Sequence, residues 1–170
     1  MLLERFRRRL LTVAAETRPS TVLDAGCGEG FVTQWLQAGL AGAAVSGVDL
    51  HEAALDRARA RVPEAAFERG DVTALPFADG AFDLVVCTEV LEHLDDPRAA
   101  LAELRRVAGG RVLVTVPHEP WFSAGNLLRG RHLRRLGSTP GHRHRWTRGA
   151  FRRVVGGEWF GAFPWQGALV

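Results

Sequence analysis

The segment that most constrains the fold of this chain is the glycine-rich run Asp24-Ala-Gly-Cys-Gly-Glu-Gly30. It leaves a short apolar stretch, Thr21 to Ala25, which is predicted to be a buried strand, and it opens a helix that is predicted to reach about Ala38. Glycines at such a turn let a ligand approach backbone N–H groups at the positive end of the helix. The alternative is a tight strand-to-helix turn without a ligand.

Strand-like and helix-like segments alternate through the next hundred residues. Strands are predicted over 43–49, 66–71, 82–87 and 111–117, and helices over 53–61 and from Asp96-Pro97 to the Gly109-Gly110 pair. An amphipathic helix precedes them, ends before Pro19, and carries its apolar face on Leu3, Phe6, Leu10, Val13 and Ala14. This alternation predicts an α/β fold with a parallel, doubly wound sheet.

The last third of the chain follows a different pattern. From His118 to Thr147 the periodicity dissolves, then residues 148–155 suit a helix and residues 157–170 suit one or two short edge strands. A structureless stretch of about 30 residues inside a domain is usually functional, so residues 118–147 are predicted to be a binding insert. The aromatic residues near the end are expected in the core: Trp159, Phe160, Phe163 and Trp165.

Length and composition limit the classes of protein that this chain can belong to. Its 170 residues and 46% hydrophobic content predict a single domain over 1–170 and exclude a disordered chain. No run approaches the roughly 18 apolar residues that span a bilayer, and charges interrupt the first apolar stretch, which disfavours a signal peptide. Two cysteines 60 positions apart, Cys27 and Cys87, suit a reducing compartment, so a cytoplasmic protein is expected.

Positive charge is concentrated at the end of the chain. Residues 1–119 hold 13 arginines and 18 acids, whereas residues 120–170 hold 9 arginines and 1 acid. Guanidinium groups suit phosphate or carboxylate, and nearby aromatic rings can stack on bases, so an anionic small molecule or single-stranded RNA is a candidate partner. A solvated basic face is the alternative. The arginines concerned are Arg129, Arg131, Arg134, Arg135, Arg143, Arg145 and Arg148, with Trp121, Phe122 and Trp146 nearby.

Three aspartates close three successive predicted strands. Asp24 stands at the front of the glycine run, where it would repel a pyrophosphate and attract an ammonium group. Asp49 can accept both hydroxyls of a ribose, and Asp71 can meet the amino group of an adenine. Parallel strands bring their carboxyl ends to one crevice, so the three acids are predicted to line it. Each alone would as often be a helix N-cap.

These motifs resemble class I S-adenosylmethionine-dependent methyltransferases, in the group that includes the ubiquinone and menaquinone biosynthesis enzymes. The resemblance covers residues 20–117 and implies a Rossmann-like seven-stranded sheet of order 3-2-1-4-5-7-6, short at both ends. The matching pieces are Val22-Leu-Asp-Ala-Gly-Cys-Gly-Glu-Gly30, Gly47-Val-Asp49, Gly70-Asp71-Val72 with Leu75-Pro-Phe-Ala-Asp-Gly-Ala-Phe-Asp83, and Glu89-Val-Leu-Glu-His-Leu-Asp-Asp-Pro97.

The resemblance also implies where S-adenosylmethionine binds. The turn around Gly26 and Gly28 would hold the methionine moiety, with Asp24 near its amino group. Asp49 would bind the ribose and Asp71 the adenine. The full set of implied cofactor residues is Asp24, Ala25, Gly26, Gly28, Asp49, Leu50, Asp71, Val72 and Thr88.

A second constellation follows the fourth predicted strand. Glu89, Glu92 and His93, together with the distant His142, resemble the E-x-x-E-H…H arrangement of the O-methyltransferases of ubiquinone biosynthesis and of enzymes that methylate the terminal 2′-hydroxyl of small RNAs. The resemblance implies a Mg²⁺ site, and carboxylates are ligands that Mg²⁺ prefers. Arg145 departs from the RNA enzymes, which have an acid before the Trp-Thr-Arg segment, and a second histidine, His144, competes with His142. Without a metal, Glu92 and His93 would start a helix.

The sequence therefore predicts a methyltransferase that acts on a small or lipid-like acceptor, of anionic character if the arginines contact it, at oxygen. His93 or His118 would take the acceptor proton, and residues 118–147 would form the acceptor site. Two alternatives stay open: a Mg²⁺-dependent RNA 2′-O-methyltransferase, and a non-catalytic protein that binds S-adenosylmethionine or S-adenosylhomocysteine.

Overall fold

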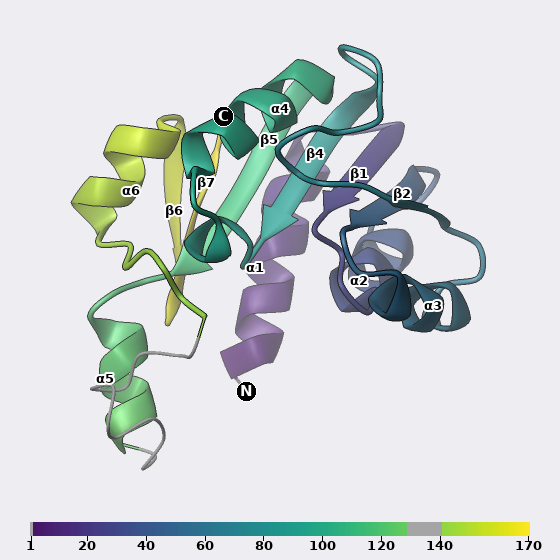
Figure 1. The fold of residues 1–170 in the computed structure, drawn as a ribbon. Helices are drawn as coiled ribbons and strands as arrows, with labels where there is room; N and C mark the ends of the chain where they lie inside the picture. Colours follow the sequence, from purple (N-terminus) through teal and green to yellow (C-terminus); the bar gives the residue numbers. More distant parts are fainter. Residues whose placement is uncertain (1, 129–140) are drawn as a thin grey trace.

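A computed structural model describes residues 2–128 and 141–170, and these residues form one mixed seven-stranded sheet with helices on both faces (Figure 1). The strand order β3-β2-β1-β4-β5-β7-β6 is the predicted one, so the fold prediction is confirmed. The strands are β1 (Thr21–Ala25), β2 (Ala44–Asp49), β3 (Ala66–Arg69), β4 (Phe82–Thr88), β5 (Ala108–Pro117), β6 (Glu158–Ala162) and β7 (Trp165–Leu169).

Parallel pairing places β1 in the middle of the five parallel strands, β3, β2, β1, β4 and β5. β1 pairs with β2 on one side and β4 on the other, and β3 and β5 extend the sheet beyond them. The last strand in sequence, β7, is antiparallel to both of its neighbours, β5 and β6. Of the two predicted edge strands only β6 is at the edge, because β7 is inserted between β5 and β6.

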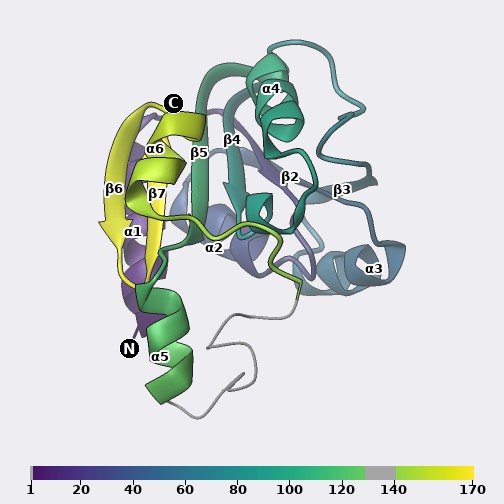
Figure 2. The same ribbon diagram turned by 60° about the vertical axis from the view of Figure 1, so that its left-hand side comes forward.

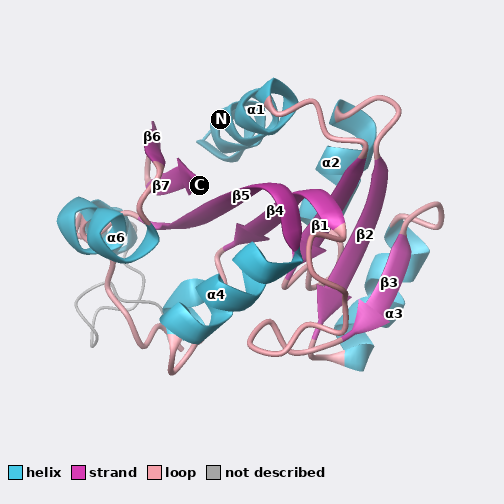
Figure 3. Cartoon of the chain, turned by 90° about the horizontal axis from the view of Figure 1, so that it is seen from above, coloured by secondary structure: helices cyan, strands magenta, loops and turns pink. Residues whose placement is uncertain are grey.

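Helices cover the sheet in two layers, and Figure 3 shows α4 and α6 on one side of the sheet with α1 and α2 on the other. α3 packs beside α2, against β2 and β3. The predicted helices at 53–61 and 148–155 are confirmed. The helices are α1 (Leu2–Glu16), α2 (Phe31–Gly39), α3 (Glu52–Arg61), α4 (Pro97–Val107), α5 (Trp121–Leu128) and α6 (Arg148–Val155), with a short 3-10 helix η1 (Leu91–His93) after β4.

Strand β4 is apolar from Leu84 to Cys87 because both of its faces are buried there. Leu84 and Val86 belong to the core under α1 and α2, where they join Phe6, Leu10, Val13 and Leu36. Val85 and Cys87 belong to the core under α4 and α6, where they join Leu101, Leu104 and Phe151. Successive side chains of a strand point to opposite faces, so one strand contributes to both cores.

Helix α4 begins and ends close to where its sequence predicts. The Asp96 side chain accepts the backbone N–H groups of Arg98 and Ala99, and Pro97 occupies the first turn. The prediction that Gly109-Gly110 lies between this helix and the next strand is wrong, because β5 already starts at Ala108. A Cβ on Gly110 would collide with the carbonyl oxygen of Asp83, so this glycine permits β5 and β4 to approach.

Two predictions for the last third of the chain are corrected. The stretch 118–147 contains a helix, α5, which the sequence obscures because Ser123, Gly125 and Asn126 are weak helix formers. Phe163 is not in the core, since 58% of it is exposed at the turn between β6 and β7. Phe160 is buried as predicted, whereas Trp159 and Trp165 are half-buried.

Two further findings concern the cysteine thiols and the apolar character of the helices. Both cysteines, Cys27 and Cys87, are buried free thiols. Within residues 2–128 and 141–170, no helix combines the length and the apolar character that crossing a membrane requires.

Replacing Gly110 with alanine is expected to lower the free energy of unfolding by about 1–3 kcal/mol, because the strand must shift away from the Asp83 carbonyl. Urea denaturation followed by circular dichroism measures the change. Gly149→Ala in α6 is the matched control, since its new Cβ would meet only the Arg153 side chain at 4.0 Å. Alanine in a helix stabilises by roughly 0.5–1 kcal/mol relative to glycine. Equal stability of the two variants would contradict the close approach of β4 and β5.

Candidate functional site

The segments that follow β1, β2, β3 and β4 enclose one cavity of about 520 Å³. In Figure 1 the arrowhead of β4 points to this end of the sheet. Small-molecule sites have volumes of roughly 300–1,000 Å³, so the cavity is large enough for a cofactor. Its lining residues are Gly26, Asp49, Leu50, His51, Gly70, Asp71, Val72, Glu89, Val90, His93 and Leu94.

The glycine turn presents bare backbone to this cavity. Gly26 has a φ of +77°, and a Cβ at this position would collide with Val90. Gly28 has a φ of +51°, with no atom within 4 Å of its missing Cβ. Both conformations are left-handed and favour glycine. A group bound at the turn therefore meets backbone atoms without an intervening side chain.

Asp49 ties the end of β2 to the glycine turn. Its Oδ2 accepts the Gly28 N–H at 2.9 Å, and its Oδ1 accepts the His51 N–H at 2.9 Å. Each carboxylate oxygen has a further lone pair, so both can also accept a hydroxyl from the cavity side. The geometry fits a ribose with two adjacent hydroxyls.

Asp24 lies beneath the turn and does not line the cavity. It is fully buried, and its Oδ2 accepts the Thr33 hydroxyl at 2.7 Å. Its Oδ1 is buried with no hydrogen-bond partner among the described residues. Burial raises the pKa of the Asp24 carboxyl to about 7.

Asp71 follows β3 in a tight turn. Its Oδ1 accepts both the backbone N–H and the hydroxyl of Thr73, at 2.8 and 2.7 Å, and these bonds lower the pKa of the Asp71 carboxyl. Val72 and Leu50 supply apolar surface beside it, and Leu50 is 49% exposed. A planar apolar ring next to a charged acceptor fits this part of the cavity.

The cofactor residues expected from the sequence divide into two groups. Those that line the cavity are Gly26, Asp49, Leu50, Asp71 and Val72, and those that do not are Asp24, Ala25, Gly28 and Thr88. Sequence reasoning missed four lining residues: His51, Gly70, Val90 and Leu94. The indication that the sequence does offer is that each of the four lies within two positions of a residue that was expected at the site.

Three of the four expected metal ligands meet at the end of β4. One ligand atom each from Glu92, His93 and His142 lies within 4.8 Å of the others, and the two imidazole centroids are 5.0 Å apart. Both oxygens of Glu92 are buried without a hydrogen-bond partner among the described residues. A buried carboxylate left without a donor, beside two imidazoles, fits a divalent cation.

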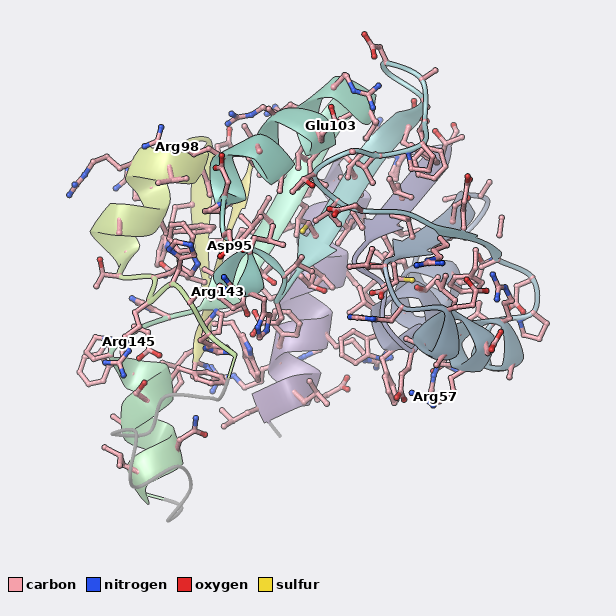
Figure 4. The ribbon with its side chains drawn as sticks, viewed as in Figure 1. Arg57, Asp95, Arg98, Glu103, Arg143 and Arg145 are labelled. Atoms are coloured by element: carbon pink, nitrogen blue, oxygen red, sulfur yellow. The ribbon has the colours of Figure 1, made fainter. Side chains whose placement is uncertain are left out.

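The histidine loop, residues 141–147, is held on η1 by hydrogen bonds to backbone carbonyls. The Arg143 and His144 N–H groups donate to the Glu92 carbonyl at 2.7 and 3.1 Å, and His144 Nε2 lies 3.0 Å from the Leu94 carbonyl. In Figure 4 the side chains of Arg143 and Asp95, which form an ion pair, point toward one another. The His144 ring thus contacts a backbone carbonyl, whereas His142 contributes a ligand atom to the cluster with Glu92 and His93.

Glu89 stands behind the cluster in a strained conformation. Its φ is +57°, which costs of order 1–3 kcal/mol for a residue with a side chain. Its Oε2 accepts the Trp165 Nε1–H at 3.0 Å, and its Oε1 is buried without a partner among the described residues. Burial and the neighbouring Glu92 raise the pKa of Glu89 well above its ordinary value, and burial raises the pKa of Glu92 to about 7.

The two candidate bases occupy different environments. His93 lines the cavity, and its Nδ1 lies 3.1 Å from the Gly141 carbonyl. His118 follows β5 outside the cavity lining, and burial, with a smaller contribution from Arg148, lowers its pKa.

Four arginines of the predicted insert lie outside the described residues: Arg129, Arg131, Arg134 and Arg135.

Aromatic rings continue from the cluster toward α5 and the β6–β7 hairpin. The Phe122 ring lies 6.2 Å from His142 and 6.3 Å from Trp165, and Trp165 lies 4.8 Å from Phe6 of α1. We call Phe122 and Trp165 the aromatic wall. It stands next to the cluster at the end of the cavity that holds His93.

A sheet of this order, with a glycine turn after β1 and carboxylates after β2 and β3, defines a class I S-adenosylmethionine-dependent methyltransferase fold. The chain belongs to the methyltransferase domain family, which it matches over residues 23–114. The matched span contains every expected cofactor residue and the first three expected metal ligands. It excludes His118 and His142.

Curated relatives agree with the family. Demethylmenaquinone methyltransferase of Thermus thermophilus is 40% identical over 116 residues, which are 65% of this chain and 53% of the relative. Malonyl-[acyl-carrier protein] O-methyltransferase of Erwinia pyrifoliae is 41% identical over 107 residues, 62% of this chain and 40% of the relative. The chain spans about half or less of the length of such relatives.

Among solved structures, the methyltransferase domain of bacterial CtHen1-CN has the same fold over nearly the whole of both chains. The TM-score is 0.75, with 99% of this chain and 98% of that chain covered at 22% identity. At this identity the likeness concerns the fold.

The free energy of unfolding is expected to fall as the pH rises from about 4 to about 7, in part because of Asp24. Its pKa is about 7 in the folded chain and 3.8 for an ordinary aspartate, so the folded state binds the extra proton between these values. Urea denaturation across this range measures the slope. Asp24→Asn is expected to flatten it, and Glu64→Gln, at an exposed position before β3, serves as the control. If the slope of the unfolding free energy against pH is unchanged in Asp24→Asn, the raised pKa of the buried Asp24 carboxyl is contradicted.

Proposed function

We propose that this chain transfers the methyl group of S-adenosylmethionine to an oxygen atom of a small or lipid-like acceptor. The observation that carries the proposal is that Asp49 and His93 line the same cavity. His93 also belongs to the cluster with Glu92 and His142. A cofactor site and a proton acceptor therefore face the same space.

The cofactor would lie along the ends of β1 to β4. Asp49 would accept the ribose hydroxyls, Leu50 and Val72 would pack on the adenine, and Asp71 would accept its amino group. The bare backbone at Gly26 would face the methionine moiety. Asp24 would act from beneath the turn as a charge that offsets the ammonium group.

Methyl transfer needs mainly alignment, since a sulfonium is already a good electrophile. The acceptor oxygen forms a bond to the methyl carbon while the carbon–sulfur bond breaks, and the electron pair stays on sulfur. The acceptor proton passes to His93. A carbonyl can only accept, so the contact with Gly141 assigns the proton to His93 Nδ1 and leaves Nε2 with a lone pair.

A divalent cation such as Mg²⁺ is the second part of the proposal. Glu92, His93 and His142 would hold it, and the nearby Glu89 has a buried Oε1 without a partner among the described residues that such a cation would also attract. A bound cation lowers the pKa of an acceptor hydroxyl, so that the oxygen reacts without a separate base. The same Nε2 of His93 cannot bind a cation and take a proton at once, so the two modes are alternatives.

The acceptor would contact the aromatic wall and residues 118–147, the segment that carries Phe122 of the wall. Trp121 is 55% exposed on α5, which supplies apolar surface for an aromatic or lipid-like molecule. The name of the Erwinia relative specifies transfer to oxygen, and that of the Thermus relative a quinone. The Erwinia name supports transfer to oxygen, whereas the Thermus name does not state the methylated atom and supports only a quinone-like acceptor.

Turnover with a panel of phenolic, quinol and carboxylate acceptors tests the proposal directly. Formation of S-adenosylhomocysteine with at least one of them is expected. Binding of the cofactor with no turnover on any acceptor would instead favour the non-catalytic alternative.

Asp49→Ala is expected to weaken binding of S-adenosylhomocysteine by roughly 10- to 100-fold, because hydrogen bonds to a charged group contribute about 1.5–3 kcal/mol. Calorimetric titration measures the change. Asp56→Ala, on an exposed position of α3 outside the cavity, is the matched control and should bind as the unsubstituted chain does. Unchanged affinity in Asp49→Ala would refute the ribose assignment.

His142→Ala is expected to abolish the dependence of turnover on a divalent cation, because it removes one ligand of the cluster. Activity is measured with Mg²⁺ or Mn²⁺ and again with a chelator. His144→Ala should keep the dependence, since His144 contacts the Leu94 carbonyl and not the cluster. Loss of the dependence in both variants would point to a disturbed histidine loop and sink the assignment of His142.

The second candidate is RNA 2′-O-methylation, which the meeting of Glu92, His93 and His142 favours equally. The two candidates differ in the acceptor. Affinity for single-stranded RNA that falls steeply with salt, together with turnover on its 3′ end, would favour the RNA enzyme. Turnover on small acceptors alone would favour the first candidate.

A further inference from the structure

A groove of about 370 Å³ separates helix α1 from the end of strand β6. Figure 2 shows β6 and α1 side by side, and the two elements are in contact. The groove is separate from the cavity of the proposed cofactor site, with which it shares no lining residue. Its lining residues are Arg5, Arg8, Arg9, Thr12, Gly161, Ala162 and Phe163.

The helix side of the groove is a basic stripe. Arg5, Arg8, Arg9 and Thr12 follow the spacing i, i+3, i+4, i+7, which places them on one face of α1. None of the residues that line the groove is acidic. Arg9 lies over the ring of Phe160 at 5.5 Å, which fixes its stem against the sheet.

Like charges lie close together in this stripe. Arg5 repels Arg8 and Arg9 at helical spacing, and a cation in the first turn opposes the helix dipole. Arg7, on another face, pairs with Glu4, but neither Arg5 nor Arg8 has an ion pair with any described residue. Glu4 attracts Arg8 as well but forms its ion pair with Arg7, so the guanidinium groups of Arg5 and Arg8 are available to bind an anion.

The strand side of the groove adds an aromatic ring and an open floor. Phe163 is 58% exposed at its rim, and Gly161 and Ala162 have no bulk that would fill it. Guanidinium groups bind phosphate oxygens in a bidentate manner, and an exposed phenyl ring is a stacking surface for a base. The combination fits a nucleoside phosphate better than a bare anion.

We propose that the groove between α1 and β6 binds a nucleoside phosphate, with the phosphates on Arg5, Arg8 and Arg9 and the base on Phe163. The phosphate comes either from a free nucleotide or from a single strand, and the chemistry is common to both. The site is independent of the proposed methyl transfer, because it shares no residue with the cofactor cavity.

Calorimetric titration with UDP tests the site, since a uridine nucleotide lacks the adenine of the cofactor. The unsubstituted chain is expected to bind UDP, and the double variant Arg5→Gln, Arg8→Gln to bind it at least about tenfold more weakly, the effect of losing one charge-assisted bond. Arg98→Gln, at an exposed position of α4 (Figure 4), is the matched charge control and should leave the affinity unchanged. Phe163→Leu should weaken UDP binding and leave pyrophosphate binding intact.

Folding of the double variant is controlled by thermal unfolding, and its melting temperature should match or exceed that of the unsubstituted chain because repulsion is removed. Asp49→Ala must bind UDP normally, which separates this site from the cofactor cavity. An affinity for oligouridylate that rises with strand length assigns the phosphates to a strand, whereas an affinity equal to that of UDP assigns a free nucleotide. Absence of UDP binding, its persistence in the double variant, or its loss in Arg98→Gln or Asp49→Ala overturns the proposal.

Discussion

Parallel pairing of β1 with β2 and β4 is the constraint on which the whole site depends. Parallel strands end at the same edge, so the turns after them open into one space although they are far apart in sequence. The hydrogen bond from Gly28 to Asp49 then locks two of those turns together. Because one carboxylate both braces the glycine turn and faces the cavity, the stability of this edge and its capacity to bind a ligand are not separable.

The cluster of Glu92, His93 and His142 is assembled by a different kind of contact. The histidine loop has no regular structure of its own, and it is held by two N–H groups on the single carbonyl of Glu92. The backbone of Glu92 thus holds the loop while its side chain remains buried and unpaired. Glu92 therefore helps to hold the loop that carries His142 and is also the acid of the cluster, while the Gly141 carbonyl links the loop directly to His93.

Local patterns in the sequence were enough to predict a parallel, doubly wound sheet with a binding edge, whereas the order of its seven strands was predicted from the resemblance to the methyltransferase family. Glycines and aspartates at strand ends indicate the turns in which they lie, so the prediction that Asp49 and Asp71 line one crevice agrees with the cavity. The choice of His142 over His144 rested on the family resemblance alone, because the contacts that distinguish the two histidines are with η1 and Leu94, about 50 residues away. The arginine stripe of α1 was also missed, since its apolar face accounts for the helix and the partner strand β6 lies about 150 residues later.

The insertion of β7 between β5 and β6 affects how the protein forms during synthesis. Strands β1 to β5 can pair as soon as they leave the ribosome, whereas β6 emerges before the strand that joins it to them. Trp165, on that last strand, donates the hydrogen bond that orients Glu89. A nascent chain that has reached β5 therefore already contains the four strands whose ends line the cavity, whereas the hydrogen bond that orients Glu89 forms only after β7 has been made.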